Sequence, residues 1–193
     1  KSGVTDILGG VSMNLSRHWA IESAVDYNPD TRIYKNRMIG GRYQPGSYRL
    51  ISAAYRSSNN EAGDPISRQV ELGWQWPLHD LWRGSDVVNA AGQGLGEGRW
   101  YGVGRLNYDP SAGRVVDSLM GFEYDAGCWI SRIVAARTQL GENLASERLM
   151  FQLELVGMSR IGQNALNSLR TQIPRYQPLR QPTMAPSRFG NYD

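Results

Sequence analysis

The chain has 193 residues, of which 40% are hydrophobic and 10% aromatic, and it carries a formal net charge of +3. Its length allows one domain, or two at most, with a real hydrophobic core. No apolar run approaches the roughly 18 residues of a membrane helix, which excludes a helical membrane protein but not a β-barrel, whose strands are apolar on one face only.

The basic residues are strongly biased, because only Lys1 and Lys35 of the 21 are lysine. Arginine favours fixed, bidentate contacts to carboxylate or phosphate, although a general arginine preference of the genome explains the bias equally well. No basic cluster is interleaved with aromatic residues, so nucleic acid is not an expected partner.

From residue 3 to about 157 the chain repeats one pattern: about ten residues in which apolar and polar side chains alternate, followed by a short cluster of Gly, Pro, Asn, Asp or Ser. This spacing is typical of antiparallel hairpins. A chain that opens inside such a pattern without a signal peptide is expected to be a fragment or a processed product. The predicted strands of the first half are about 3–15, 19–27, 32–43 (with a bulge at Gly40-Gly41), 48–56 and 67–76.

The tract 77–98 is irregular, and its spaced glycines predict a flexible loop that lacks the Lys and Ser/Thr of a phosphate-binding loop. Strands then resume, to make about nine in all, at about 99–108, 114–125, 128–139 and 147–157. The stretch 130–140 could also be helical because of Ala135 and Ala136, and we interpret it as a strand.

Two strands alternate most clearly. The predicted strand 67–76 has Val70, Leu72, Trp74 and Trp76 on one face and Gln69, Glu71, Gly73 and Gln75 on the other. The strand 147–157 has Leu149, Phe151, Leu153 and Leu155 on one face and Arg148, Gln152 and Glu154 on the other.

The composition changes after Gly157, which divides the chain into a β-segment at 1–157 and a C-terminal tail at 158–193. Residues 164–173 predict one short amphipathic helix. The proline-rich stretch 174–193 is expected to be extended or disordered.

The aromatic residues favour a membrane β-barrel over a soluble sandwich, because they lie near strand ends, where barrels place interfacial girdles. Strands of ten or more residues also match a tilted membrane crossing better than the shorter strands of globular sheets. Nine strands with two unpaired edges would not be viable in lipid, so the segment should belong to a larger barrel. The aromatic residues concerned are Trp19, Tyr27, Tyr43, Tyr48, Trp76, Trp100, Tyr108, Tyr124 and Trp129.

The sequence gives little support for a catalytic site or a metal site. The only histidines, His18 and His79, fall in predicted turns or loops, and no His, Cys and Asp cluster has the spacing of a metal site. We therefore expect no metal, no cofactor and no catalytic residue. A Ser–His–Asp site could still be assembled in space around either histidine, but solvated turn residues explain both better.

The single cysteine, Cys128, cannot form a disulfide within the chain. It is either a buried, inert thiol, as free cysteines most often are, or its partner lies outside this chain.

Residues 121–176 resemble the C-terminal part of LptD, also called OstA or Imp, the outer-membrane lipopolysaccharide-assembly family. Three segments carry the resemblance: GFEYDAGCWISRIVAAR, MFQLELVGMSRIG and NSLRTQIPRYQP. The first is specific, because a Tyr-Asp-x-x-Cys-Trp block followed one hairpin later by Phe-x-Leu-Glu-Leu-x-Gly is not a generic barrel pattern. About a third of the chain carries the match, and the upstream strands share only the general strand-and-turn pattern of the family.

The resemblance implies a very large barrel of the Gram-negative outer membrane with a periplasmic N-terminal domain. It also implies a plug lipoprotein, LptE, and delivery of lipopolysaccharide by the periplasmic LptA bridge. The lipid would leave sideways, between the first and last strands, into the outer leaflet. Residues 147–157, with Leu149, Phe151, Leu153 and Leu155, would then be one lip of that lateral gate.

The resemblance also bears on Cys128. The family commonly has two adjacent cysteines here, each bonded to the N-terminal domain, and in this chain Gly127 stands at the first position. One of two bridges would therefore be absent, and the partner of Cys128 would lie in a part of the protein that this chain lacks.

We therefore expect a transport translocon without catalytic residues, in which polar lumen residues meet phosphorylated sugar while acyl chains pass through the seam. The candidate lumen residues are Arg132, Arg148, Gln152 and Glu154, for which a solvated lumen wall is the simpler interpretation. The alternative function is an outer-membrane barrel hydrolase or a general porin.

Overall fold

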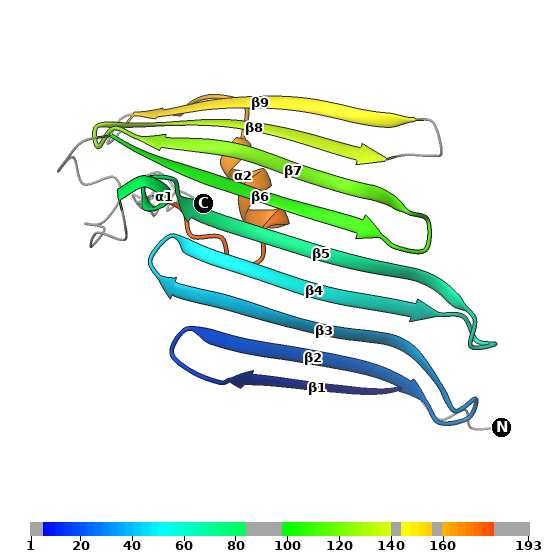
Figure 1. Cartoon of the computed structure of the whole chain (residues 1–193). Coiled ribbons are helices and arrows are strands. Elements are labelled where there is room, and N and C mark those ends of the chain that lie inside the picture. The colour runs from blue at the N-terminus through cyan, green and yellow to red at the C-terminus, as the bar shows by residue number, and fades with distance from the viewer. Residues whose placement is uncertain (1–5, 84–97, 140–143, 156–159, 180–193) are drawn as a thin grey trace, which may run out of the picture.

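The computed structural model describes residues 6–83, 98–139, 144–155 and 160–179, which form one ten-stranded sheet with two helices (Figure 1). All strands are antiparallel to their neighbours and follow the order of the sequence. The elements are β1 (Ile7–Asn14), β2 (Trp19–Asn28), β3 (Ile33–Gly46), β4 (Arg49–Asn59), β5 (Pro65–Pro77), α1 (Asp80–Arg83), β6 (Arg99–Asp109), β7 (Arg114–Asp125), β8 (Trp129–Gln139), β9 (Ala145–Leu155), β10 (Arg160–Gly162) and α2 (Ala165–Gln172).

This architecture confirms the predicted all-β antiparallel fold, as in a segment of a larger β-barrel. The nine predicted strands are present within a few residues of their expected bounds, and the stretch 130–140 is a strand. The tenth strand, β10, was not predicted, because three residues are too short to show an alternation. No helix in the described residues is long and apolar enough to cross a membrane.

The sheet has two chemically different faces, named here by the position of α2. On the α2 face lie Glu71, Gln75 and Gln152, which are buried, whereas Leu72 and Phe151 on the opposite, open face are exposed. The alternation of apolar and polar residues therefore predicted correctly which side chains of β5 and β9 share a face.

The predicted bulge at Gly40-Gly41 is wrong. Both glycines pair in regular register with β2 and β4. The irregularities of β3 lie elsewhere: Lys35 is the extra residue in the pairing with β2, and the pairing with β4 shifts between Tyr43 and Gly46. Gly40 serves close packing instead, because a Cβ there would lie 3.3 Å from the Cβ of Ala54.

The segment between β5 and β6 is described only at its start, and residues 84–97 of the predicted flexible loop lie outside the described residues. The short helix α1 is fastened to β4 by a bidentate ion pair. The guanidinium of Arg49 donates from Nε and Nη2 to the carboxylate of Asp80 at 2.6 and 2.9 Å.

The predicted amphipathic helix at 164–173 is confirmed as α2, whose N-terminus is capped by the Asn164 side chain. Residues 174–179, which follow α2, form neither a helix nor a strand, and they are docked on the sheet because Tyr176 and Leu179 are buried against it. Residues 180–193, the rest of the stretch expected to be extended or disordered, lie outside the described residues.

Candidate functional site

The main feature of the α2 face is the docked C-terminal segment, residues 164–179. Leu166, Leu169 and Ile173 pack in one apolar cluster with residues from β4, β6, β7, β8 and β9. Burying a side chain of this size contributes roughly 1.5–3 kcal/mol. The strand residues of the cluster are Leu50, Val103, Leu119, Val134 and Met150.

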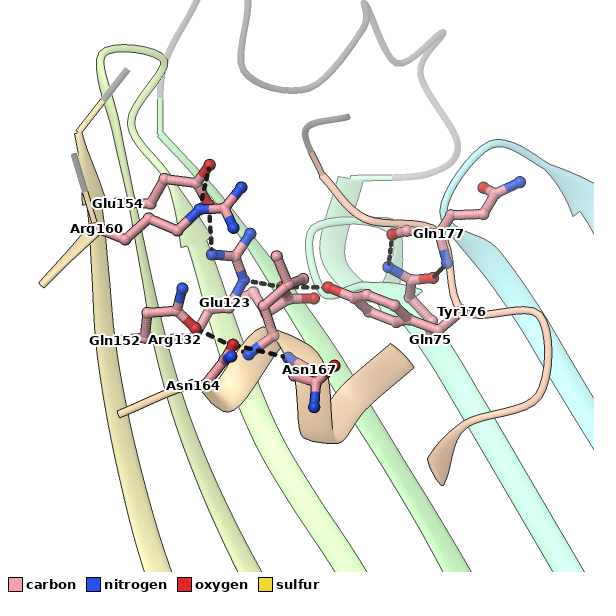
Figure 2. A network of polar contacts seen from close by, with 11 residues as sticks. Gln75, Glu123, Arg132, Gln152, Glu154, Arg160, Asn164, Asn167, Tyr176 and Gln177 are labelled. Atoms are coloured by element: carbon pink, nitrogen blue, oxygen red, sulfur yellow. Dashed lines mark hydrogen bonds and ion pairs between the residues drawn. The ribbon is translucent and has the colours of Figure 1, made fainter. Parts of the chain in front are cut away.

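A buried ion network lies beside this apolar cluster (Figure 2). Arg132 Nε donates to Glu123 Oε1 at 2.8 Å, and Arg132 Nη1 donates to Glu154 Oε2 at 2.8 Å. The register of the sheet brings the three residues together, because Arg132 lies opposite Glu123 on β7 and opposite Gln152, two residues from Glu154, on β9. Three neighbouring strands are thus joined by one guanidinium.

The C-terminal segment completes this network. The phenol of Tyr176 donates to Glu123 Oε1 at 2.6 Å. Burial raises the pKa of Tyr176 well above its usual value, and the neighbouring Glu123 raises it further, so the phenol keeps its proton and remains a donor. Arg132 is 0% exposed, and a charge so deeply buried requires partners of this kind.

Amide side chains fix both ends of the segment to the sheet (Figure 2). At the start of α2, the backbone N–H of Leu166 donates to Gln152 Oε1 at 2.8 Å. At the far end, Gln75 Nε2 donates to the carbonyl of Gln177 at 2.8 Å, and Gln177 N donates back to Gln75 Oε1 at 2.9 Å. The Gln177 side chain also accepts from the N–H of Tyr48 at 2.6 Å.

A second polar cluster lies on the same face, nearer the turn between β6 and β7. Arg105 Nη1 donates to Asp117 Oδ1 at 3.1 Å, and Arg105 Nη2 donates to Glu71 Oε2 at 3.3 Å. Arg56, whose side chain is 53% exposed, lies 3.6 Å from Glu71 Oε2. This part of the α2 face is therefore polar and partly open to solvent.

A cavity of about 120 Å³ separates β2–β5 from residues 174–175 of the tail. Its charged lining residues include Glu22, Arg42, Arg56 and Arg175. Arg175 Nη2 lies 3.8 Å from Glu22 Oε1, so the tail also makes a charged contact with β2. The space combines these charged groups with apolar lining residues such as Met38 and Pro174, and it is large enough for several water molecules.

The predicted lumen residues divide into two groups. Arg132, Gln152 and Glu154 are buried under the C-terminal segment, so the solvated wall expected for them is wrong. Arg148 lies on the same face of β9 and is exposed. The difference arises because the tail covers one end of β9 and leaves the other uncovered.

The apolar residues of β9 lie on the open face. Leu149 is 68% exposed and Phe151 is 50% exposed, while Leu153 and Leu155 are half-buried. They form a continuous apolar row along the strand, as the alternation predicted. Their role in a lateral gate stays a prediction.

Cys128 is exposed in the turn that joins β7 to β8, so the interpretation as a buried, inert thiol is wrong. The preceding Gly127 has a φ of +83°, and its N–H donates to Asp125 Oδ1 at 2.8 Å. A cysteine at position 127 would be strained in this conformation. The disulfide of Cys128 to another part of the protein stays a prediction.

The two histidines differ. His18 is exposed in the turn after β1, as expected for a solvated turn residue. His79 is partly buried, with Nε2 lying 3.3 Å from Asp80 Oδ1, so the same interpretation is wrong there. Within the described ranges, no group of three or more metal-ligating side chains is found.

Sequence reasoning did not single out Glu123, Tyr176, Gln75 and Gln177 as a site. Glu123 gave a usable signal, since it falls on the polar face of a clearly alternating strand beside the cysteine motif. Tyr176 and Gln177 gave none, because their partners are 53 and 102 residues away in the sequence.

Comparisons with known proteins support the resemblance over a much larger part of the chain. Residues 1–82 match the LptD family, described as LPS transport system D. The chain is 50% identical over 192 residues to "LPS-assembly protein LptD" of Polaromonas sp. and 49% identical to that of Albidiferax ferrireducens, with 98% of this chain covered in each case. The protein of the same name from Thiobacillus denitrificans is 34% identical over 90% of the chain. The chain spans 21–23% of the length of these relatives.

Proposed function

The chain belongs to the LptD family, and from this membership we propose that it is part of an outer-membrane translocon that inserts lipopolysaccharide into the outer leaflet. The observation that carries the proposal is identity of up to 50% to proteins named LPS-assembly protein LptD, along 98% of this chain. The proposed route is lateral release through a barrel seam of which β9 forms one lip.

The open face of the sheet supports a location in the outer membrane. At the end where Cys128 lies, aromatic rings meet in pairs, with centroids 4.7 Å apart for Trp19 and Tyr43 and 4.8 Å apart for Trp100 and Tyr124. At the other end, the rings of Tyr27 and Tyr34 meet at 5.0 Å. Apolar residues such as Ile39, Leu72 and Phe122 lie exposed between the two rows.

The spacing of these rows fits a bilayer. Trp19 and Tyr27 lie at the two ends of β2, and Trp100 and Tyr108 lie at the two ends of β6. Eight residues of strand span about 26 Å, which a tilt of about 40° reduces to roughly 20 Å across the membrane. This is close to the apolar band of outer-membrane barrels, which is about 25 Å tall between its aromatic girdles.

The edges of the sheet support a larger barrel. Within the described residues, β1 has a strand partner on one side only, and most of β9 is likewise open on one side. Backbone groups in lipid must be paired, so the rest of the protein would supply the neighbouring strands. This requirement agrees with a chain that covers about a fifth of its relatives.

The α2 face would then be the wall of the lumen. We assign the open polar part, with Arg42, Arg56 and Arg105, to contact with the phosphorylated sugar, because guanidinium groups bind phosphate well. The plug lipoprotein LptE would bind the same face, and LptA would deliver lipopolysaccharide through the N-terminal domain, to which Cys128 would be bonded. None of these roles requires a catalytic residue.

Site-specific photocrosslinking in the complete protein tests this function. A benzoylphenylalanine at Arg56, on the α2 face, should give light-dependent adducts with lipopolysaccharide in cells. The same residue at Trp100, on the open face at the Cys128 end, should give adducts with phospholipid instead. A hydrolase or a porin would give no lipopolysaccharide adduct at Arg56, and that result would overturn the proposal.

A further inference from the structure

The two edges of β9 differ in how far they are paired. β8 pairs with β9 along the whole strand, from Ala145 to Leu155. On the other edge, β10 pairs only with Gln152, Leu153 and Glu154. In the part of the chain that the structure describes, no strand pairs with residues 145–150 on that edge.

The short paired stretch is held by several independent contacts. Gln163 N continues the pairing of β10 by donating to the carbonyl of Phe151 at 2.9 Å. Arg160 Nε lies 3.4 Å from Glu154 Oε1, which connects the stretch to the buried ion network. The chain then enters α2, whose Leu166 N–H is held by Gln152. The same end of β9 therefore binds both the edge strand and the docked helix.

Gly162 makes this close approach possible. Its φ is +106°, a conformation that favours glycine, and a Cβ at this position would collide with the carbonyl oxygen of Phe151. No other residue type would let the chain lie against β9 here without displacement of the backbone.

We propose that residues 160–163 are a latch that occupies the Phe151–Glu154 end of the free edge of β9. The closing strand of the complete protein then pairs only with residues 145–150. The inference deepens the proposed function and rests on the seam assigned there to β9. The expected partner is a β-strand from outside this chain, because the remaining backbone groups of an edge in lipid need one.

The latch restricts where the seam can separate. The end of β9 next to α2 is already paired with β8 on one edge and with β10 on the other, and Arg132 of β8 binds its Glu154. This end of β9 therefore stays closed. Separation of the closing strand is confined to the half of β9 that is remote from α2. The opening would therefore end where the latch, residues 160–163, pairs with β9.

Photocrosslinking at two positions of β9 tests the latch. Leu149 and Leu153 lie on the same face of the same strand, and Leu153 lies directly opposite Ile161. Directly opposite residues on neighbouring strands lie within contact distance. In the complete protein, benzoylphenylalanine at Leu153 should crosslink to the tryptic peptide 161–170. At Leu149 it should crosslink to a strand outside this chain.

The possible crosslinking results test the latch and the proposed seam independently of each other. A Leu153 crosslink to the same distant strand as Leu149, or no crosslink to residues 160–163, would overturn the latch. A Leu153 crosslink to 161–170 with no distant partner for Leu149 would support the latch and overturn the seam.

A glycine pair gives a second measurement. Gly162→Ala should reduce the Leu153 adduct with the peptide 161–170 at least tenfold. Gly113→Ala should leave it unchanged, because Gly113 also has a positive φ, of +63°, but a Cβ there meets nothing within 4 Å. An adduct that survives Gly162→Ala undiminished counts against the latch.

Discussion

At the scale of single residues, Arg132 organises the site, because its guanidinium binds carboxylates on both neighbouring strands. Removal of one member of a buried ion network leaves the others buried and less well compensated. Arg132 therefore matters less for the attraction it contributes than for the two carboxylates that depend on it.

Arg132→Ala should lower the free energy of unfolding by about 3–5 kcal/mol, because the buried Glu123 would lose this cation and Glu154 would keep only the more distant Arg160. Urea denaturation of the complete protein in detergent micelles, followed by tryptophan fluorescence, measures the change. Arg148→Ala is the matched control, since Arg148 is an exposed arginine on the same face, and it should change the free energy by less than about 0.5 kcal/mol. Equal effects of the two substitutions would contradict the role of the network.

Cys128 leads to a second prediction at this scale. Its thiol is exposed in a turn, where a partner from another domain can reach it. The complete protein should therefore migrate differently on gels with and without reductant, and Cys128→Ser should abolish the difference. A mobility shift that persists in Cys128→Ser, or no shift in the unmodified protein, would rule out a bond at this residue.

At the scale of secondary-structure elements, the docking of α2 should be the part of the fold most sensitive to apolar substitution. Leu169 is fully buried between α2 and the sheet, and Leu169→Ala should cost about 2–5 kcal/mol of docking free energy. Limited proteolysis should then cut the C-terminal segment faster, whereas Arg170→Ala, at the exposed neighbouring position, should not change the rate. Unchanged proteolysis of Leu169→Ala would show that the helix is not held by this cluster.

The elements also show how much the sequence could predict. Strands β1 to β9 were predictable because each carries its own alternation, and α2 was predictable because its helical period is local. The docking of residues 174–179 was not predictable, because Tyr176 and Gln177 are held by Glu123 and Gln75, far away in the sequence. The bulge was misplaced for a similar reason: glycines indicate a possible irregularity, but pairing with the neighbouring strand decides where it occurs.

At the scale of the whole molecule, the sheet separates an apolar open face from the α2 face, which carries the polar clusters beside the apolar cluster under α2, and the tail covers only part of the α2 face. Figure 1 shows α2 lying on one side of the sheet beside the later strands, while β1 to β3 carry no helix. The molecule therefore combines a region that its own C-terminal segment closes with a region left open to other molecules. In the proposed barrel, the first region would be rigid wall and the second would contact the transported lipid.

The membrane location makes a prediction that the tryptophans can test. Trp100 is on the open face, whereas Trp82 belongs to α1 and is 78% exposed outside the strands. In proteoliposomes made with phospholipids brominated on their acyl chains, the quenchable part of the tryptophan fluorescence should fall in Trp100→Phe and stay constant in Trp82→Phe. The physical reason is that bromine quenches at short range, so only an indole in contact with acyl chains is affected. If Trp82→Phe removed as much quenchable signal as Trp100→Phe, the open face would not be the lipid-facing surface, and the assignment of the α2 face to the lumen would be wrong as well.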